Sequence, residues 1–145
     1  MFNVIQISDT HLSPVRRHFV PNWNAVARWL RLQAPSLVIN TGDVSLDGAE
    51  DKSELLFCRQ QFASIESPIL CVPGNHDVGD SLHIAPGQPV NDVRQNRWRA
   101  VFGDDWRLRD IEHCRMVGLN IMIFGTHHAV AARIWEWFNS VLCAR

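Results

Sequence analysis

Five polar side chains that can bind a metal ion follow three short apolar runs of the sequence: Asp9, His11, Asp43, Asn75 and His76. Asp9 and His11 are two residues apart, so on an extended segment both side chains point to the same side. There they can bind one ion with an oxygen and a nitrogen. The residue types and their spacing therefore predict a metal site.

Asp43 is the residue that could connect two metal ions. Gly42 before it lets the backbone turn sharply, and a carboxylate has two oxygens that can bridge two cations. Asn75 offers an amide oxygen to a second ion, and His76 stays available for proton transfer or for contact with an oxyanion. Two cations ~3.5–4 Å apart would activate a water and neutralise both faces of an in-line phosphoryl displacement. The side chains therefore predict hydrolysis of a phosphoester.

The apolar runs at 2–7, 36–40 and 68–72 predict the strands that position these residues. Helical periodicity at 22–34 and 49–65 separates them. An order of strand, helix, strand, helix, strand predicts parallel pairing with right-handed crossovers. Ligands of such sheets bind at the carboxyl ends of the strands, where all three metal-competent segments fall. Each motif alone is weak evidence for a metal site. Together they are stronger evidence, because ordinary turns do not need a His or Asp after each of three successive strands.

The second half of the sequence gives softer signals. Residues 81–90 contain two prolines and a glycine and predict a surface loop. A helix is expected over 91–103, a strand pair turning near Glu112 over 106–126, and a final helix over 131–142.

Composition limits the class of protein. The 145 residues are 46% hydrophobic and 20% charged, which predicts one globular domain over residues 1–145. The net charge of −1, with both signs interspersed, provides no field for long nucleic acid or a membrane surface. Four cysteines without C-x-x-C spacing favour a reducing compartment, and no apolar run approaches the ~20 residues of a membrane span. We therefore expect a cytoplasmic protein.

The segments "ISDTHL", "TGDVSLDG" and "PGNHD" resemble the first three signature blocks of the calcineurin-like metallophosphoesterases, closest to the bacterial cyclic-nucleotide phosphodiesterase branch. The resemblance implies an α/β/β/α sandwich with a dinuclear site of Mn, Fe or Zn type. By this resemblance Asp9 and His11 bind the first metal, Asp43 bridges, and Asn75 binds the second metal. His76 would contact the phosphate or protonate the leaving oxygen.

The sequence departs from the family pattern in its later histidines. Family members carry a histidine after another strand and then a G-H-x-H block, whereas the nearest substitute here, His127 and His128 in "GTHH", has the wrong order. A solvated loop pair is the favoured interpretation of these two residues. We therefore expect a domain truncated after its first half to two thirds, with an exposed apolar surface or an uncovered sheet edge. A second copy could complete it by dimerisation or domain swapping.

The leading functional prediction is a metal-dependent phosphodiesterase acting on cyclic nucleotides or similar small diesters. "GDVSLDG" lacks the Asp-Arg-Gly continuation typical of protein phosphatases, which disfavours a phosphomonoesterase, and the missing basic stripe disfavours a nuclease. An alternative of another class is a truncated, non-catalytic metal-binding fragment that pairs with a partner chain.

Three other features allow two interpretations each. Asp47 either orients His76 or forms a turn before Gly48. Asp77 is favoured as a cap of the following turn over a catalytic role. The arginines of "RQNRWR" offer either phosphate ligands or a solvated helix face.

Overall fold

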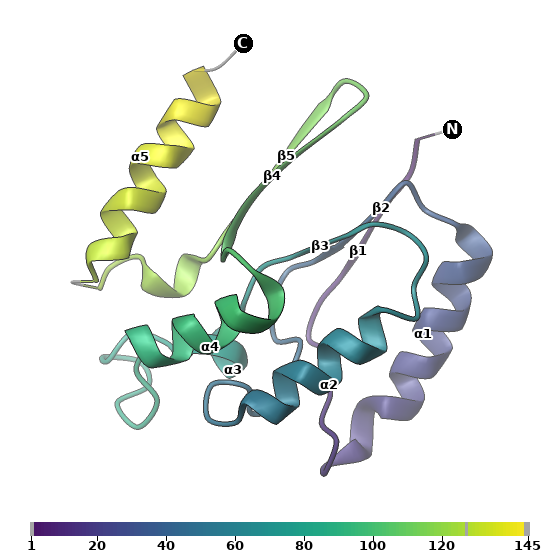
Figure 1. The fold of residues 1–145 in the computed structure, drawn as a ribbon, viewed down its shortest axis with the longest axis horizontal. Helices are drawn as coiled ribbons and strands as arrows, with labels where there is room; N and C mark the ends of the chain where they lie inside the picture. The colour runs from purple at the N-terminus through teal and green to yellow at the C-terminus, as the bar shows by residue number, and fades with distance from the viewer. Residues whose placement is uncertain (1, 127, 144–145) are drawn as a thin grey trace.

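A three-stranded parallel sheet, with the order β1-β2-β3, lies at the centre of the protein (Figure 1). The computed structural model describes residues 2–126 and 128–143. The strands are β1 (Val4–Ile7), β2 (Leu37–Asn40) and β3 (Ile69–Cys71). Ile7 pairs with Asn40, and Asn40 with Cys71, so the three strands end at the same edge. The predicted strands and their parallel pairing are confirmed.

The helices and the remaining strands also follow the expected order. The described elements outside the sheet are η1 (Arg17–Phe19), α1 (Val20–Gln33), α2 (Lys52–Phe62), α3 (Asn75–Val78), α4 (Asp92–Phe102), β4 (Trp106–Ile111), β5 (Cys114–Leu119), η2 (Ile121–Ile123) and α5 (Ala129–Cys143).

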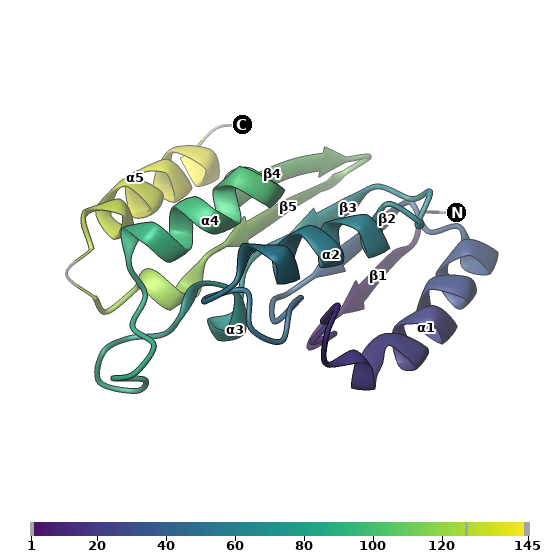
Figure 2. The same cartoon turned by 60° about the horizontal axis from the view of Figure 1, so that its bottom comes forward.

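The two faces of the sheet pack against different layers because successive strand residues point to opposite sides. Val38 and Cys71 belong to the larger core, together with buried residues of α1 and α2 such as Trp23 and Leu55. Both helices cover this one face (Figure 2), as right-handed crossovers between strands added in the same direction require.

The antiparallel hairpin β4–β5 packs on the other face of the sheet. Gly118 of β5 lies so close to β3 that a Cβ there would be 2.7 Å from Val72 and 2.9 Å from Leu70. The last helix, α5, lies beyond the hairpin, on the side away from α1 (Figures 1 and 2), and Arg115 of β5 donates to the Val141 carbonyl at 3.0 Å. Helices, parallel sheet, hairpin and α5 thus form the layers of an α/β/β/α arrangement.

One element differs from its prediction. The apolar segment Ile121–Ile123 is a 3-10 helix, η2, rather than part of a strand. The side chain of Asn120 accepts a hydrogen bond from Met122 N–H at 3.0 Å and donates to Asp105 at 2.7 Å. These bonds turn the chain directly after β5, so the hairpin ends at Leu119.

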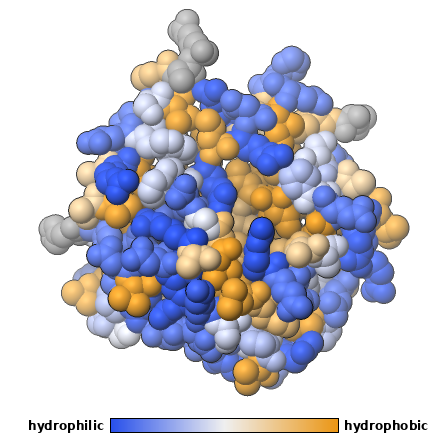
Figure 3. Space-filling view, in the orientation of Figure 1, coloured by the Kyte–Doolittle hydropathy of each residue, from blue (hydrophilic) through white to orange (hydrophobic). Residues whose placement is uncertain are grey.

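The second face of the sheet is only partly covered. A groove of about 380 Å³ runs between the sheet and β5, and its lining includes Ile39, Leu70, Val72 and Met116. Figure 3 shows hydrophobic side chains gathered between the hairpin and the sheet. Parallel sheets are normally covered on both faces, and here the hairpin leaves this groove beside β5. The expected exposed apolar surface stays a prediction, because Leu70 and Val72 in the groove are buried. Within the described ranges, none of the helices has the length and apolar character needed to cross a bilayer.

Candidate metal centre

Three side chains from three different loops meet at the carboxyl edge of the sheet. His11 follows β1, Asp43 follows β2 and His76 follows β3. One ligand atom from each lies within 4.8 Å of the other two, and all three residues are half-buried. Two imidazoles and a carboxylate are donors that suit divalent transition metals.

The backbone adopts an uncommon conformation at the residues expected to hold the first metal. Asp9, His11 and Asp43 have φ angles of 54°, 41° and 51°, in the left-handed region that side-chain-bearing residues seldom occupy. The prediction that an extended segment brings Asp9 and His11 together is therefore wrong about the backbone conformation, although the two side chains do lie close together. Turns at both residues bring Asp9 Oδ1 to 3.7 Å from His11 Nε2. Such conformations concentrate at functional sites because surrounding structure must enforce them.

Backbone hydrogen bonds from the loop after β2 enforce this geometry. Asp9 N–H donates to the Gly42 carbonyl at 3.1 Å, and His11 N–H donates to the Asp43 carbonyl at 3.0 Å. Leu12 N–H donates to the Val44 carbonyl at 3.0 Å. The first two loops therefore run side by side beyond the ends of their strands.

Two glycines let the loops after β2 and β3 approach one another. A Cβ at Gly42, where φ is 120°, would lie 2.9 Å from Gly74 Cα. A Cβ at Gly74 would lie 2.5 Å from the backbone nitrogen of Asp43. This contact brings His76 N–H to 2.9 Å from Asp43 Oδ1, to which it donates.

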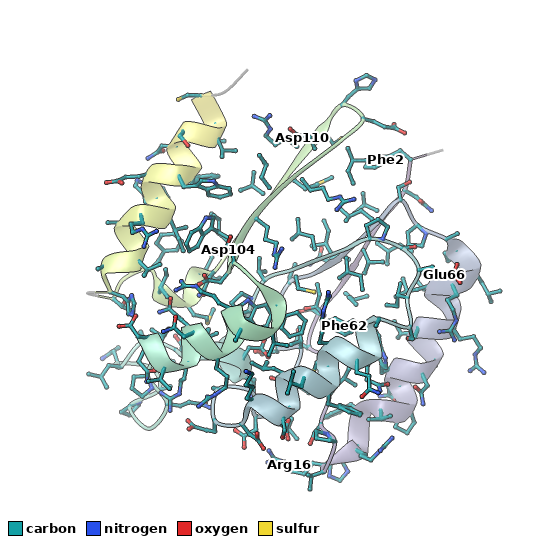
Figure 4. All side chains as sticks on the ribbon, in the orientation of Figure 1. Phe2, Arg16, Phe62, Glu66, Asp104 and Asp110 are labelled. Atoms are coloured by element: carbon teal, nitrogen blue, oxygen red, sulfur yellow. The ribbon has the colours of Figure 1, made fainter. Side chains whose placement is uncertain are left out.

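The imidazole of His76 has one nitrogen fixed by the backbone. Nδ1 lies 2.8 Å from the Leu46 carbonyl, which can only accept, so Nδ1 carries the proton. In the neutral ring Nε2 is then left with its lone pair. Asp47, the residue considered for this orienting role, instead pairs at 3.0 Å with Arg16, which Figure 4 labels. The sequence could not indicate the Leu46 carbonyl as this partner, because every residue has a backbone carbonyl.

His11 has an unsatisfied nitrogen. Its Nδ1 is buried without a hydrogen-bond partner among the described residues, although buried polar atoms are almost always paired. The ring lies between Phe19, at 5.9 Å, and His76, at 4.6 Å between ring centroids. An orphaned nitrogen, on an imidazole that lies beside carboxylates and a second imidazole, fits a metal site.

Asp9 and Asn75 lie next to this cluster. The side chain of Asp9 is 65% exposed at the rim of the site. Asn75 is the first residue of α3 and half-buried, between Gly74 and His76. The structure thus gathers the predicted residues at one edge of the sheet, with His76 in the tightest group. The individual roles of Asp9, His11, Asp43, Asn75 and His76 stay predictions.

Asp77 holds the loops after β2 and β3 together. Its side chain is completely buried, and its two oxygens accept from Val44 N–H, Ser45 N–H and Gly74 N–H at 3.0 to 3.1 Å. Ser45 Oγ donates to it at 2.5 Å. Burial raises the pKa of Asp77 to about 6, and the hydrogen bonds act in the opposite direction. The predicted cap of the following turn is not what the structure shows: Asp77 instead accepts from the preceding Gly74 N–H, at the start of α3, and from the loop after β2. The sequence did not indicate the bonds to the other loop.

A second buried carboxylate, Glu54 of α2, connects the first two loops. It accepts from Ser13 Oγ at 2.7 Å and from Asp47 N–H at 3.2 Å. Its exposed fraction is 4%. A glutamate on the buried side of an amphipathic helix is the sequence signal that could have identified it.

The histidines considered as substitutes lie elsewhere or outside the described residues. His128 Nε2 is 3.2 Å from Asp92 Oδ1 and 3.2 Å from the Gln95 side-chain nitrogen, both on α4. The expected solvated loop is therefore wrong for His128, because the start of α5 packs beside α4. His127 lies outside the described residues.

The comparisons with known proteins agree with this arrangement. The sequence model of the calcineurin-like phosphoesterase family matches residues 2–141. The chain belongs to this family. It is 33% identical over 123 residues to a protein of Moraxella catarrhalis (strain BBH18) named "Probable cyclic nucleotide phosphodiesterase". That match covers 74% of this chain and 42% of the relative, so the chain spans about two fifths of that protein's length.

Gly74→Ala should disrupt the site by separating the two loops that meet at Asp43. We expect a loss of about 1–3 kcal/mol in the free energy of unfolding, and loss of the rise in melting temperature on adding Mn²⁺. Gly87→Ala is the matched control, because nothing lies within 4 Å of a Cβ at Gly87. An undiminished response to Mn²⁺ in Gly74→Ala would contradict the geometry.

Asp77→Ala should be strongly destabilising because three backbone N–H groups lose their acceptor in a buried place. We expect the free energy of unfolding to fall by about 3 kcal/mol or more, measured by urea denaturation. Asp110→Ala, which removes an exposed carboxylate paired with Arg115, should leave the midpoint nearly unchanged. Equal effects of the two substitutions would argue against a clamp at Asp77.

Proposed function

We propose that this chain forms the metal-binding part of a phosphoester hydrolase that acts on cyclic nucleotides or similar small diesters. The observation that carries the proposal is the convergence of His11, Asp43 and His76 within 4.8 Å at the carboxyl edge of a parallel sheet. Family membership supports hydrolysis of a phosphoester. The name of the Moraxella catarrhalis relative supports a cyclic nucleotide as the substrate.

The residues present fit two metal ions of Mn, Fe or Zn type. His11 and Asp43 supply a nitrogen and oxygen donors, Asp9 adds a carboxylate beside His11, and Asn75 offers an amide oxygen next to His76 in the chain. Divalent ions bound there would supply Lewis-acid activation of water and neutralise charge on the phosphate. The buried, unpaired Nδ1 of His11 is the observation that favours a bound cation over a simple polar cluster.

Residues of the chain determine where protons go during hydrolysis of one P–O bond by one water. His76 keeps its Nδ1 proton on the Leu46 carbonyl, so Nε2 is the nitrogen that exchanges protons with substrate or water. In the neutral ring Nε2 accepts a proton, and in the protonated ring it delivers one to the leaving oxygen. Asp43 Oδ1 is held by the His76 N–H, which leaves Oδ2 to bind a cation.

A phosphomonoesterase or nuclease of the same family remains the enzymatic alternative. The arginines that could have contacted a nucleic acid are already engaged within the protein: Arg94 with Glu50, Arg97 with the Ala49 carbonyl and Arg99 with Asp105. This engagement favours a small substrate over a long polyanion. The alternative of another class is a non-catalytic metal-binding fragment that pairs with a partner chain.

A cytoplasmic location is part of the proposal. All four cysteines are free thiols, and Cys58 and Cys71 are buried. Burial raises the pKa of both thiols, that of Cys71 to about 12, so neither supplies a thiolate at neutral pH. Reduced cysteines used as small core residues are typical of a reducing compartment.

The activity is tested on the purified chain with Mn²⁺, using a chromogenic diester and cyclic AMP. Asp43→Asn should lower turnover by about a hundred-fold or more, because a shared ligand is lost. Asp47→Asn is the matched control, since that carboxylate pairs with Arg16 at the rim. Absence of turnover together with an Asp43-dependent rise in melting temperature on adding Mn²⁺ would favour the non-catalytic alternative. Absence of both would contradict the metal site.

We also propose that a second copy of the chain covers the apolar groove, as a dimer or a domain-swapped pair. The groove is apolar, and it lies on a face of the sheet that other elements cover in most parallel sheets. Among soluble oligomers, cyclic dimers are the commonest. Sedimentation velocity should show a dimer that Met116→Glu converts to a monomer. Leu32→Glu, at a 78% exposed position on α1, should leave the dimer intact. A monomeric wild-type chain would contradict this proposal.

A further inference from the structure

Two arginines of α4 bind the loop that follows the Asp43 segment. Arg97 donates through Nη1 to the Ala49 carbonyl and, at 3.4 Å, to the Gly48 carbonyl. Arg94, which is 9% exposed, donates through Nε to the same Ala49 carbonyl at 3.3 Å. Its other nitrogens donate to the Pro89 carbonyl and to Glu50. Neither side chain is therefore part of a solvated helix face.

The same loop contacts His76 at two points. Ala49 N–H donates to the His76 carbonyl at 2.9 Å, and the Leu46 carbonyl accepts from His76 Nδ1 at 2.8 Å. Between these points, Gly48 N–H donates to Ser45 Oγ at 3.0 Å. The loop of residues 46–49 thus holds both the backbone and the ring of His76.

We propose that Arg97, assisted by Arg94, is a positioning residue that fixes the orientation and tautomer of His76 through the loop of residues 46–49. A neutral imidazole can carry its proton on either nitrogen, and the Leu46 carbonyl selects Nδ1 only while it stays at hydrogen-bond distance. Ala49 is fully buried, so its carbonyl oxygen needs a donor from the protein.

The guanidinium groups supply this donor from a helix rather than from another loop. Hydrogen bonds from a charged donor are about twice as strong as those between neutral groups. α4 also contributes the fully buried Trp98, one turn from Arg94 and next to Arg97 in sequence, to the main core. The arginines therefore hold the loop of residues 46–49 at a fixed position relative to the packed core. The same loop holds His76. The catalytic meaning of this arrangement rests on the proposed function, but the positioning itself does not.

Arg97→Met tests the proposal because it removes the donors while keeping a long side chain. The readout is the nitrogen spectrum of the His76 ring by NMR, at a fixed pH where the ring is neutral. The wild-type chain should show a single Nδ1–H tautomer with a slowly exchanging proton. Arg97→Met should show a mixture of tautomers and faster exchange of the Nδ1 proton. Where the chain turns over a diester, kcat should fall about ten- to a hundred-fold with KM nearly unchanged.

Arg31→Met is the matched control, since Arg31 also donates to a backbone carbonyl, that of Ser64 at 3.3 Å, on another part of the protein. It should leave the His76 ring signals as in the wild type. Arg97→Lys keeps the charge and one donor, and should restore most of the Nδ1–H tautomer.

A purely structural role predicts a different result: a lower melting temperature with an unchanged His76 spectrum. That outcome, or a wild-type spectrum with two tautomers, overturns the proposal. If Arg97→Met does not fold, the spectrum of Arg97→Ala, which also removes the donors, decides: an undisturbed His76 ring proton together with unchanged kcat in that variant counts against positioning. Absence of turnover in the wild-type chain would contradict the proposed function, whereas the NMR result would still decide the role of Arg97.

Discussion

The buried carboxylate of Asp77 is the constraint on which the site depends. It accepts hydrogen bonds from the loops after β2 and β3 at the same time, through Val44, Ser45 and Gly74. Three backbone N–H groups without water or secondary-structure partners need this acceptor. Because Val44 follows Asp43 and Asp77 follows His76, these bonds fix the backbone directly beside both candidate residues.

Asp9, His11 and Asp43 adopt left-handed conformations in the loops beside this clamp. Each costs of order 1–3 kcal/mol, and glycine would remove that cost. Glycine would also remove the imidazole and carboxylate groups that converge at the sheet edge. Hydrogen bonds between the neighbouring loops stabilise the strained turns. The protein therefore has strained backbone at positions where side-chain chemistry is needed, and has glycine at Gly42 and Gly74, where the backbones of two loops touch.

Two helices outside the sheet hold the loop that contacts His76. Glu54 fixes the loop at Asp47, and the arginines of α4 fix it at Ala49. Glu54 lies on α2 and the arginines lie on α4, and both helices pack on the same face of the sheet. The candidate site is thus built from loop segments that bond to well-packed helices at Asp47 and Ala49.

Local patterns were enough to predict the three strands, their parallel pairing and the sheet edge where His11, Asp43 and His76 meet, because hydrophobic period and turn residues are local properties. They failed at Ile121–Ile123, where a short apolar run has no distinctive period and the bonds of Asn120 decide the conformation. Only the tertiary structure decided that the Leu46 carbonyl, and not Asp47, orients His76, and that Asp77 joins two loops. These contacts join residues about 30 positions apart through common backbone groups, which leave no mark in the local pattern.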